Sequence, residues 1–213
     1  MTVWDNFITV DTETTGIGSD DQIIQLSIVN LNNEILFNEY FKPSVAISQE
    51  ATNVHGITME QLLDKPSFSV FSDQILKLLR DKYIIGYSID FDIRMIKNHL
   101  PDVENLGFTG LIDLIKIYAE YHGVLSSRGG YKFQKLSKAL NDLSIDGYIS
   151  SNTKYNFANF HNAVTDVRAT NELFFELLKR SPELFNTEIL SFLQSDDFTK
   201  QISKFRGIQS VLC

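Results

Sequence analysis

Near its start the chain carries the stretch Phe7-Ile8-Thr9-Val10-Asp11-Thr12-Glu13-Thr14-Thr15-Gly16, in which an apolar run ends in two acidic residues. Side chains two positions apart on a strand point to the same face, so Asp11 and Glu13 are predicted to project side by side at a strand end. Two adjacent carboxylates repel each other unless a cation or a shared proton compensates. An oxygen-rich pair of this kind suits Mg²⁺ or Mn²⁺. For an isolated Asp-x-Glu, two solvated charges on an exposed strand would be the simpler interpretation.

A second informative segment covers residues 83–96. An apolar run ends at Gly86, and the isoleucines that follow recur at helical spacing, at Ile89, Ile93 and Ile96. Asp92 is predicted to lie in the first turn of this helix, where the helix dipole favours an anion. Asp90 competes with Asp92 for any functional role, and helix-start electrostatics alone could account for either acid.

A third segment is His161-Asn162-Ala163-Val164-Thr165-Asp166. Residues five apart on a helix lie about 140° from each other, so His161 and Asp166 do not share one strict face. Both can approach one point if the start of the helix lies over a cleft. An imidazole has a pKa near neutrality and is a natural general base, although a lone histidine is often a surface or core residue.

In this order, the three segments resemble the three exonuclease motifs of the DEDDh (DnaQ-like) 3′→5′ exonuclease family. The matching residues are the acids of the first, second and third motifs and the histidine of the third: Asp11, Glu13, Asp92, Asp166 and His161. The five-residue spacing of the third motif is that of the histidine subtype.

A further resemblance lies in residues 53–58, Asn53-Val54-His55-Gly56-Ile57-Thr58, which are similar to the His-Gly-Ile-Thr segment of epsilon-like proofreading members. The similarity runs from about Asn6 to Arg180, most of the chain. The second motif departs from the family at Tyr87-Ser88, where many relatives carry His-Asn. Neither position is the carboxylate, so little consequence for metal binding is expected.

The resemblance implies a reaction and a cofactor. It implies hydrolysis of the terminal phosphodiester at a 3′ end, which releases nucleoside 5′-monophosphates, with two Mg²⁺ or Mn²⁺ ions per active site. It further implies that Asp11, Glu13 and Asp166 hold one ion and that Asp11 bridges to the second. Asp92 would act through water, and His161 would accept the proton of the attacking water.

Substrate-binding residues are also suggested by the resemblance. Thr14, Thr15 and Gly16 would lie against the terminal sugar and base, and His55 could approach the same terminus. Ordinary turn chemistry and loop packing are the alternatives for these four residues. The best candidate for phosphate contacts is the basic segment 126–138, which contains Arg128 and no acid, although a solvated loop fits it about as well.

Turns divide the chain into apolar runs and segments of helical spacing. Strands are predicted over 7–11, 22–30, 35–41, 83–87 and 109–112, and helices over 68–79, 89–100, 114–121, 133–143 and 159–180. The first three strands are joined so closely that they form an antiparallel meander. This order predicts an α/β chain with a mixed sheet covered by helices. The family resemblance implies the ribonuclease-H-like fold, with a five-stranded mixed sheet of an antiparallel meander plus parallel strands, flanked by helices.

Domain organisation follows from where the resemblance ends. Residues 1–180 are predicted to form the exonuclease domain, and residues 181–213 a C-terminal helical extension that is not an independent domain. At 213 residues, a single domain is the expectation.

Composition narrows the class of protein. The chain has 19 basic and 27 acidic residues and a net charge of −8, which argues against a protein that coats nucleic acid through a broad basic surface. An enzyme that grips only a chain end remains compatible with this charge. The single cysteine, Cys213, allows no disulfide framework. The first residues lack the basic-then-apolar pattern of a signal peptide, and no stretch approaches the roughly 20 apolar residues of a membrane span, so a cytoplasmic protein is expected.

The substrate and partners are less constrained. Single-stranded DNA or a frayed 3′ end, in proofreading or repair, is favoured by the His-Gly-Ile-Thr segment. An exoribonuclease or oligoribonuclease acting on RNA is the nearest alternative, because a single side chain can read the 2′-hydroxyl. A polymerase-associated accessory subunit and an inactive binding subunit are further alternatives, with a DNA polymerase or replication partner in the first case. The oligomeric state stays open.

Overall fold

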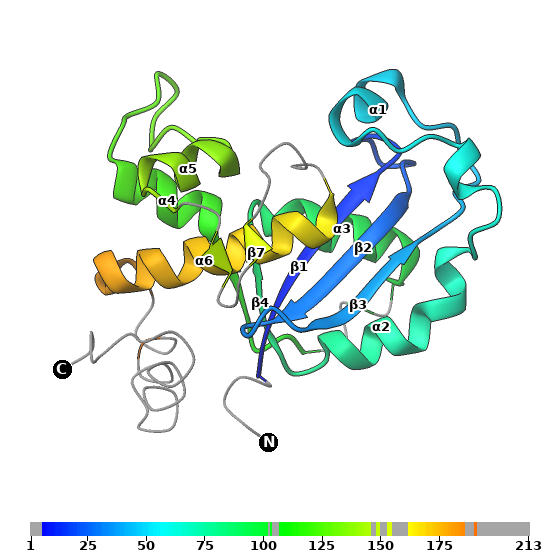
Figure 1. Cartoon of the computed structure of the whole chain (residues 1–213), viewed down its shortest axis with the longest axis horizontal. Helices are drawn as coiled ribbons and strands as arrows, with labels where there is room; N and C mark the ends of the chain where they lie inside the picture. The colour runs from blue at the N-terminus through cyan, green and yellow to red at the C-terminus, as the bar shows by residue number, and fades with distance from the viewer. Residues whose placement is uncertain are drawn as a thin grey trace.

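The computed structural model describes residues 6–101, 103, 107–145, 148–149, 153–154, 162–185 and 190. A five-stranded sheet lies at the centre, in the order β3-β2-β1-β4-β5 (Figure 1). Its strands are β1 (Phe7–Thr14), β2 (Ile23–Asn30), β3 (Ile35–Tyr40), β4 (Tyr83–Gly86) and β5 (Gly110–Asp113). The first three strands pair antiparallel, and β1, β4 and β5 pair parallel. The predicted α/β fold with a mixed five-stranded sheet is confirmed.

Helices cover both faces of this sheet. They are α1 (Gln49–His55), α2 (Ser72–Leu79), α3 (Ile89–His99), α4 (Leu114–His122), α5 (Leu136–Asp142) and α6 (Ala163–Arg180). Short 3-10 helices lie at Glu60–Leu62, Phe68–Phe71 and Pro182–Leu184, and β6 (Tyr148–Ile149) pairs antiparallel with β7 (Thr153–Lys154).

Alternation along β1 divides the core into two layers. Ile8 and Val10 pack in one cluster with residues of α2 and α3. Phe7 packs on the opposite face in a cluster with residues of α4, α5 and α6. Successive residues of a strand point to opposite faces, so each layer takes every second side chain of β1.

The start of α6 is fixed over the sheet by polar contacts. Asn162 caps the helix by accepting a hydrogen bond from Val164, and its amide donates to the Tyr40 hydroxyl at 3.0 Å. The backbone N–H of Ala163 donates to the side chain of Gln25 at 3.3 Å. Gln25 is the β2 partner of Glu13. These contacts place the first turn of α6 beside the acidic end of β1.

A buried amide holds the middle of the same helix. Asn171 is fully buried, accepts a hydrogen bond from the Thr9 hydroxyl and donates to the Asn30 carbonyl and the Asn33 side chain, both at 2.8 Å. Because an unpaired buried amide is costly, α6 is held in the register that satisfies all three contacts.

Several element boundaries differ from those predicted. Residues 42–65 contain α1, whose seven residues include none that is buried, so it lacks the apolar periodicity on which the prediction relied. The predicted helix 68–79 begins as a 3-10 turn, and the predicted helix 133–143 begins only at Leu136 because Lys135 is extended.

The C-terminal third of the chain is described only in part. The predicted helix 159–180 is described from Ala163 onward, where α6 begins. Of the predicted extension 181–213, the structure describes residues 181–185 and 190, and Phe185 packs edge-on against Phe174 of α6. No helix in the described part of the chain is both long and apolar enough to cross a membrane.

Ser88, at the N-cap of α3, has a left-handed backbone with φ 71° and ψ 43°. This conformation costs an L-residue about 1–2 kcal/mol, and glycine avoids that cost while losing about 0.5–1 kcal/mol of extra chain entropy. Ser88→Gly is therefore expected to stabilise the fold by roughly 0.5–1 kcal/mol and raise the melting temperature by about 2 °C. Ser137→Gly, inside α5, is the control and should lower it. A lower melting temperature for Ser88→Gly, measured by thermal denaturation, would contradict this account.

Candidate active site

Three carboxylates meet where β1 approaches the start of α6. Asp11 and Glu13 lie two residues apart on β1, and Asp166 lies in the first turn of α6. One carboxylate oxygen of each lies within 4.8 Å of the others. The structure thus brings together acids that are more than 150 residues apart in sequence, as the family resemblance implied.

The fourth acid, Asp92, reaches the same region from α3. It lies in the first turn of that helix and is buried, with 3% of its surface exposed. Its Oδ1 accepts two hydrogen bonds from Thr12, from the backbone N–H at 2.9 Å and from the hydroxyl at 2.7 Å. Thr12 stands between the two acids of β1, so a single strand residue positions Asp92 beside them.

The competition between Asp90 and Asp92 is resolved by their surroundings. Asp90 is exposed, and its carboxylate forms an ion pair with Lys116 at 2.5 Å. Lys116 also pairs with Asp113, the N-cap residue of α4, at 3.1 Å. Asp90 therefore belongs to a surface ion-pair network, and Asp92 is the acid of α3 that faces β1.

Burial is the largest cause of the raised pKa values in this cluster, and repulsion between the carboxylates adds to it at Asp11 and Glu13. Burial and the neighbouring charges of Asp92, Asp166 and Glu13 raise the pKa of Asp11 well above its ordinary value. Burial, followed by the charges of Asp166 and Asp92, raises the pKa of Glu13 to about 8. Burial also raises the pKa of Asp92 to about 7, although the two hydrogen bonds from Thr12 oppose this shift. Near neutral pH the cluster therefore takes up protons or a cation.

A divalent cation fits this donor set. Asp11, Glu13 and Asp166 offer carboxylate oxygens close enough to share one ion, and hard cations such as Mg²⁺ and Mn²⁺ prefer oxygen ligands. Among the described residues, no lysine or arginine forms an ion pair with Asp11, Glu13 or Asp92. The acidic cluster is thus consistent with a metal-dependent active site.

The end of β1 and the turn that follows it contain Thr14, Thr15 and Gly16, which the resemblance assigned to the substrate terminus. The Thr14 hydroxyl donates to the Gly16 carbonyl at 2.6 Å, and the fully buried Thr15 hydroxyl donates to Asp21 at 2.7 Å. A Cβ at Gly16 would lie 2.5 Å from the Asp21 carboxylate, so the close approach of Asp21 requires glycine here. The Thr15 N–H donates to the Gln22 carbonyl and the Thr15 carbonyl accepts from the Ser48 N–H, both at 2.8 Å, so the side chain and the backbone of Thr15 hold the turn.

His55, at the end of α1, is brought to this same turn. Its Nδ1 accepts a hydrogen bond from the Ile57 N–H at 3.0 Å, so Nε2 carries the proton of the neutral ring. Nε2 lies 3.2 Å from the Thr14 carbonyl oxygen, to which it donates. A contact across 41 residues thus places His55 beside Thr14.

Of the two remaining predicted residues, only Arg128 is among those that the structure describes. Arg128 is exposed in the loop between α4 and α5, which Figure 1 shows rising beyond these helices, away from α1. His161 lies outside the described residues. Sequence reasoning missed Thr12, although its place between two acids on the alternate face of the strand was a usable signal.

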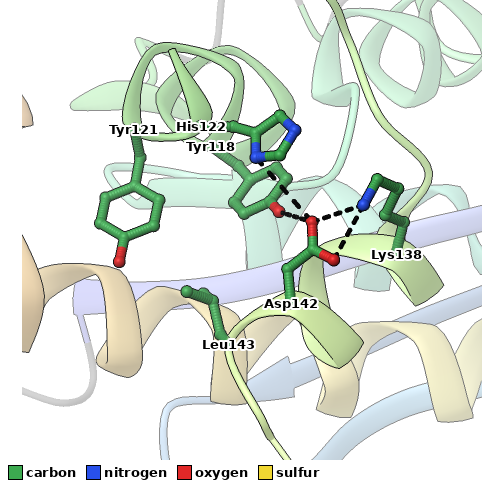
Figure 2. Close-up of a pocket in the computed structure, with 6 residues that line it drawn as sticks. All are labelled: Tyr118, Tyr121, His122, Lys138, Asp142 and Leu143. Carbon is green, nitrogen blue, oxygen red and sulfur yellow. Dashed lines mark hydrogen bonds and ion pairs between the residues drawn. The ribbon is translucent and has the colours of Figure 1, made fainter. Parts of the chain in front are cut away.

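A separate cavity of about 570 Å³ lies between α4 and α5 (Figure 2). Asp142 stands at its centre and accepts hydrogen bonds from the Tyr118 hydroxyl at 2.7 Å and from Lys138 at 2.7 and 2.8 Å. His122, Tyr121 and Leu143 complete the lining. None of the four clustered acids lines this cavity, so it is distinct from the site on β1.

Residues 8–174 match the model of the protein family RNase_T, which is described as Exonuclease. An uncharacterized exonuclease of Escherichia phage 186 is 31% identical over 175 residues, which cover 78% of this chain and 84% of the phage protein. A DNA polymerase III subunit epsilon of Buchnera aphidicola is 29% identical over 67% of this chain and 68% of its own length.

Similarity extends to a protein named for RNA and to a solved structure. RNA exonuclease 4 of Mycosarcoma maydis is 26% identical to this chain over 175 residues. The matched region covers 79% of this chain and 41% of that protein. The structure of exonuclease X in complex with 5′ overhanging duplex DNA superposes with a TM-score of 0.60 at 20% identity. The superposition covers 89% of this chain and 99% of that one and shows that the fold is shared.

The raised pKa of Glu13 gives a pH-dependent stability in the metal-free protein. The folded state holds the Glu13 proton more tightly than the unfolded state, so stability is lost as pH rises from about 4.5 to about 8. In EDTA, Glu13→Gln is expected to raise the melting temperature by a few degrees at about pH 8 and by less at about pH 5. The exposed Glu39→Gln is the control and should change neither value. Equal effects of Glu13→Gln at both pH values in thermal melts would contradict the repulsion.

Thr12 is expected to act through Asp92. Thr12→Val removes the hydroxyl that donates to Asp92 Oδ1 and keeps the backbone donor. Loss of a contact that orients a metal-site carboxylate typically costs about 10- to 100-fold in metal affinity, so Mn²⁺ titration calorimetry should show a loss of about tenfold. Thr12→Ser should restore the affinity. Identical affinities for Thr12→Val and the unaltered chain would show that the hydroxyl plays no such part.

Proposed function

Because the chain belongs to the RNase_T exonuclease family, we propose that it removes nucleotides one at a time from the 3′ end of single-stranded DNA or of a frayed duplex, releasing nucleoside 5′-monophosphates. The observation that carries this proposal is the convergence of Asp11, Glu13 and Asp166 beside Asp92. Such a cluster is unfavourable in an inert protein and is suited to phosphodiester hydrolysis.

The division of labour follows from the placement of the acids. Asp11, Glu13 and Asp166 would hold a divalent cation, and Asp11 would also face a second one. When bound, the ions supply Lewis acidity toward the phosphoryl group, the attacking water and the leaving oxygen. Asp92, held by Thr12, orients water at the edge of the cluster. His161 accepts the proton of the attacking water.

End selection is proposed to occur at the turn after β1. Thr14 and Gly16 offer backbone groups beside the acids, and His55 closes the turn by donating to the Thr14 carbonyl. A 3′-terminal nucleotide bound against these groups has its terminal phosphodiester close to Asp11 and Glu13. An internal nucleotide could bind there only if the nucleic acid strand continued through the space that this turn occupies.

DNA is favoured over RNA by two features. The epsilon subunit of Buchnera aphidicola, which is similar to this chain over 67% of this chain's length, is by its name part of DNA polymerase III. The His55-Gly56-Ile57-Thr58 segment, typical of epsilon-like members, is the one that reaches Thr14. An exoribonuclease is the second candidate, favoured by the similarity to RNA exonuclease 4 over 79% of this chain.

The organisation of the chain supports a catalytic unit over residues 1–180, with residues 181–213 as an extension that could contact a polymerase or another replication partner. The matched family ends at residue 174, six residues before the end of α6. Co-purification of a polymerase with the full chain, and not with a chain ending at Arg180, would assign the extension to that contact.

Digestion of 5′-labelled single-stranded DNA and RNA, each with Mg²⁺, Mn²⁺ or EDTA, tests the proposal. A 3′ end that shortens stepwise, faster for DNA than for RNA and only with a metal, is expected. His161→Gln should lower kcat by about 10²- to 10⁴-fold and leave Mn²⁺ affinity unchanged, because a general base is lost and no ligand is removed.

His122→Gln is the matched control and should keep full activity, because His122 lines the separate cavity between α4 and α5. Shortening from the 5′ end, or a rate that survives EDTA, would contradict the proposed reaction. Full activity of His161→Gln would remove His161 from the role of base.

A further inference from the structure

The loop between α4 and α5 is a preformed hairpin, here called the 124–133 hairpin for its residues Val124–Phe133. An antiparallel bridge joins Leu125 to Tyr131. The Ser126 N–H donates to the Gly130 carbonyl at 2.9 Å, and the Lys132 N–H donates to the Val124 carbonyl at 2.7 Å. The 124–133 hairpin is therefore ordered by its own backbone hydrogen bonds.

The turn of this hairpin depends on two glycines. Gly129 and Gly130 have φ angles of 90° and 68°, a region that other residues rarely adopt. Consecutive residues of this kind reverse the chain tightly. The turn places Arg128 at the tip of the arm, directly before Gly129.

Apolar side chains on this arm face solvent. Leu125 is 73% exposed and Phe133 57%, and Val124 and Tyr131 are more than 40% exposed. Exposed apolar groups that gather on one short element mark a binding surface more often than they occur by chance. Two of these four residues are aromatic, and an aromatic ring can stack on any nucleobase.

The same segment is strongly basic in an acidic chain. Residues 123–141 contain no acid and four basic residues, Arg128, Lys132, Lys135 and Lys138, whereas the whole chain has a net charge of −8. Lys138 pairs with Asp142. Within the described residues, Arg128, Lys132 and Lys135 form no ion pair, so their charges are available to a phosphate backbone.

The base of the arm is tied to the elements that build the active site. The Tyr87 hydroxyl donates to the Gln134 carbonyl at 2.7 Å, and Tyr87 lies between β4 and the start of α3, which carries Asp92. Figure 1 shows β1 pointing toward α1, with the hairpin on the other side of the molecule, beyond α4 and α5. The base of the hairpin is thus joined, through Tyr87, to the connection that leads into α3 and Asp92.

We propose that the 124–133 hairpin binds the unpaired nucleotides upstream of the scissile bond in a single nucleic acid strand, an inference that rests on the proposed function. Tyr131 and Phe133 stack on bases, and Arg128 and Lys132 contact phosphates. The hairpin thereby sets the affinity for long substrates and leaves the chemistry at the 3′ terminus unchanged.

Two double variants test this, Tyr131→Ala/Phe133→Ala and Arg128→Ala/Lys132→Ala. For 5′-labelled single-stranded DNA of about 16 nucleotides, KM is expected to rise about tenfold in each, because each removes contacts to upstream nucleotides. The values of kcat for this substrate and of kcat/KM for a dinucleotide should not change. The basic variant should also lower the slope of log affinity against log salt by about 1.4, since each single-strand phosphate contact contributes about 0.7.

The matched control is Val70→Ala/Lys77→Ala, which removes an exposed apolar side chain and an exposed lysine near α2 and should leave every value unchanged. An unchanged KM for the long substrate in both hairpin variants would overturn the inference. An equal loss on the long substrate and the dinucleotide would also overturn it, because the hairpin would then act on the catalytic end itself.

A binding measurement separates failure of this inference from failure of the proposed function. Fluorescence anisotropy with the same labelled DNA in EDTA needs no hydrolysis. If the unaltered chain hydrolyses neither substrate, the proposed function fails. The hairpin inference is still supported by about tenfold weaker DNA binding in the variants, and it is overturned by equal binding.

Discussion

The two-residue alternation of β1 is the constraint on which the rest of the structure depends. Asp11 and Glu13 point to the layer that contains α6, where Asp166 lies, whereas Thr12 meets Asp92 of α3. A shift of one residue in the pairing of β1 would exchange the two sets of side chains and separate the acids. Antiparallel pairing with β2 and parallel pairing with β4 fix this register from both sides.

The site is held together against its own electrostatics. Burial raises the pKa values of Asp11, Glu13 and Asp92, and repulsion from neighbouring acids of the cluster adds to the shift at Asp11 and Glu13, so the acids oppose folding at neutral pH when no cation is bound. Hydrogen bonds between uncharged residues of α6 and the sheet supply the free energy that opposes this repulsion. Asn171 of α6 bonds to Thr9 and Asn30 of the sheet and to Asn33 in the turn between β2 and β3, and Gln25 receives the first N–H of the same helix. The packing of α6 thus maintains a strained cluster that a divalent cation relieves.

How far the sequence predicts this arrangement depends on the kind of signal. Apolar periodicity identified the sheet and α3, because it is a local repeat that survives folding. The family resemblance grouped Asp11, Glu13 and Asp166 and selected Asp92 over Asp90. Helix α1 was missed because none of its residues is buried. The ion pair of Asp90 with Lys116, 26 residues away, and the role of Thr12 needed the packing of α3 on its neighbours. Contacts between distant elements carry no local pattern, so these features emerged only with the fold.

Diffraction from crystals grown with Mn²⁺, recorded where manganese scatters anomalously, tests the central claim most directly. The account predicts an anomalous peak about 2–2.5 Å from carboxylate oxygens of Asp11, Glu13 and Asp166, with a second peak beside Asp11. Crystals of Asp11→Asn should lose the second peak and weaken the first. Manganese bound only elsewhere on the molecule, with these carboxylates uncoordinated, would contradict the claim that this cluster is built to hold divalent cations.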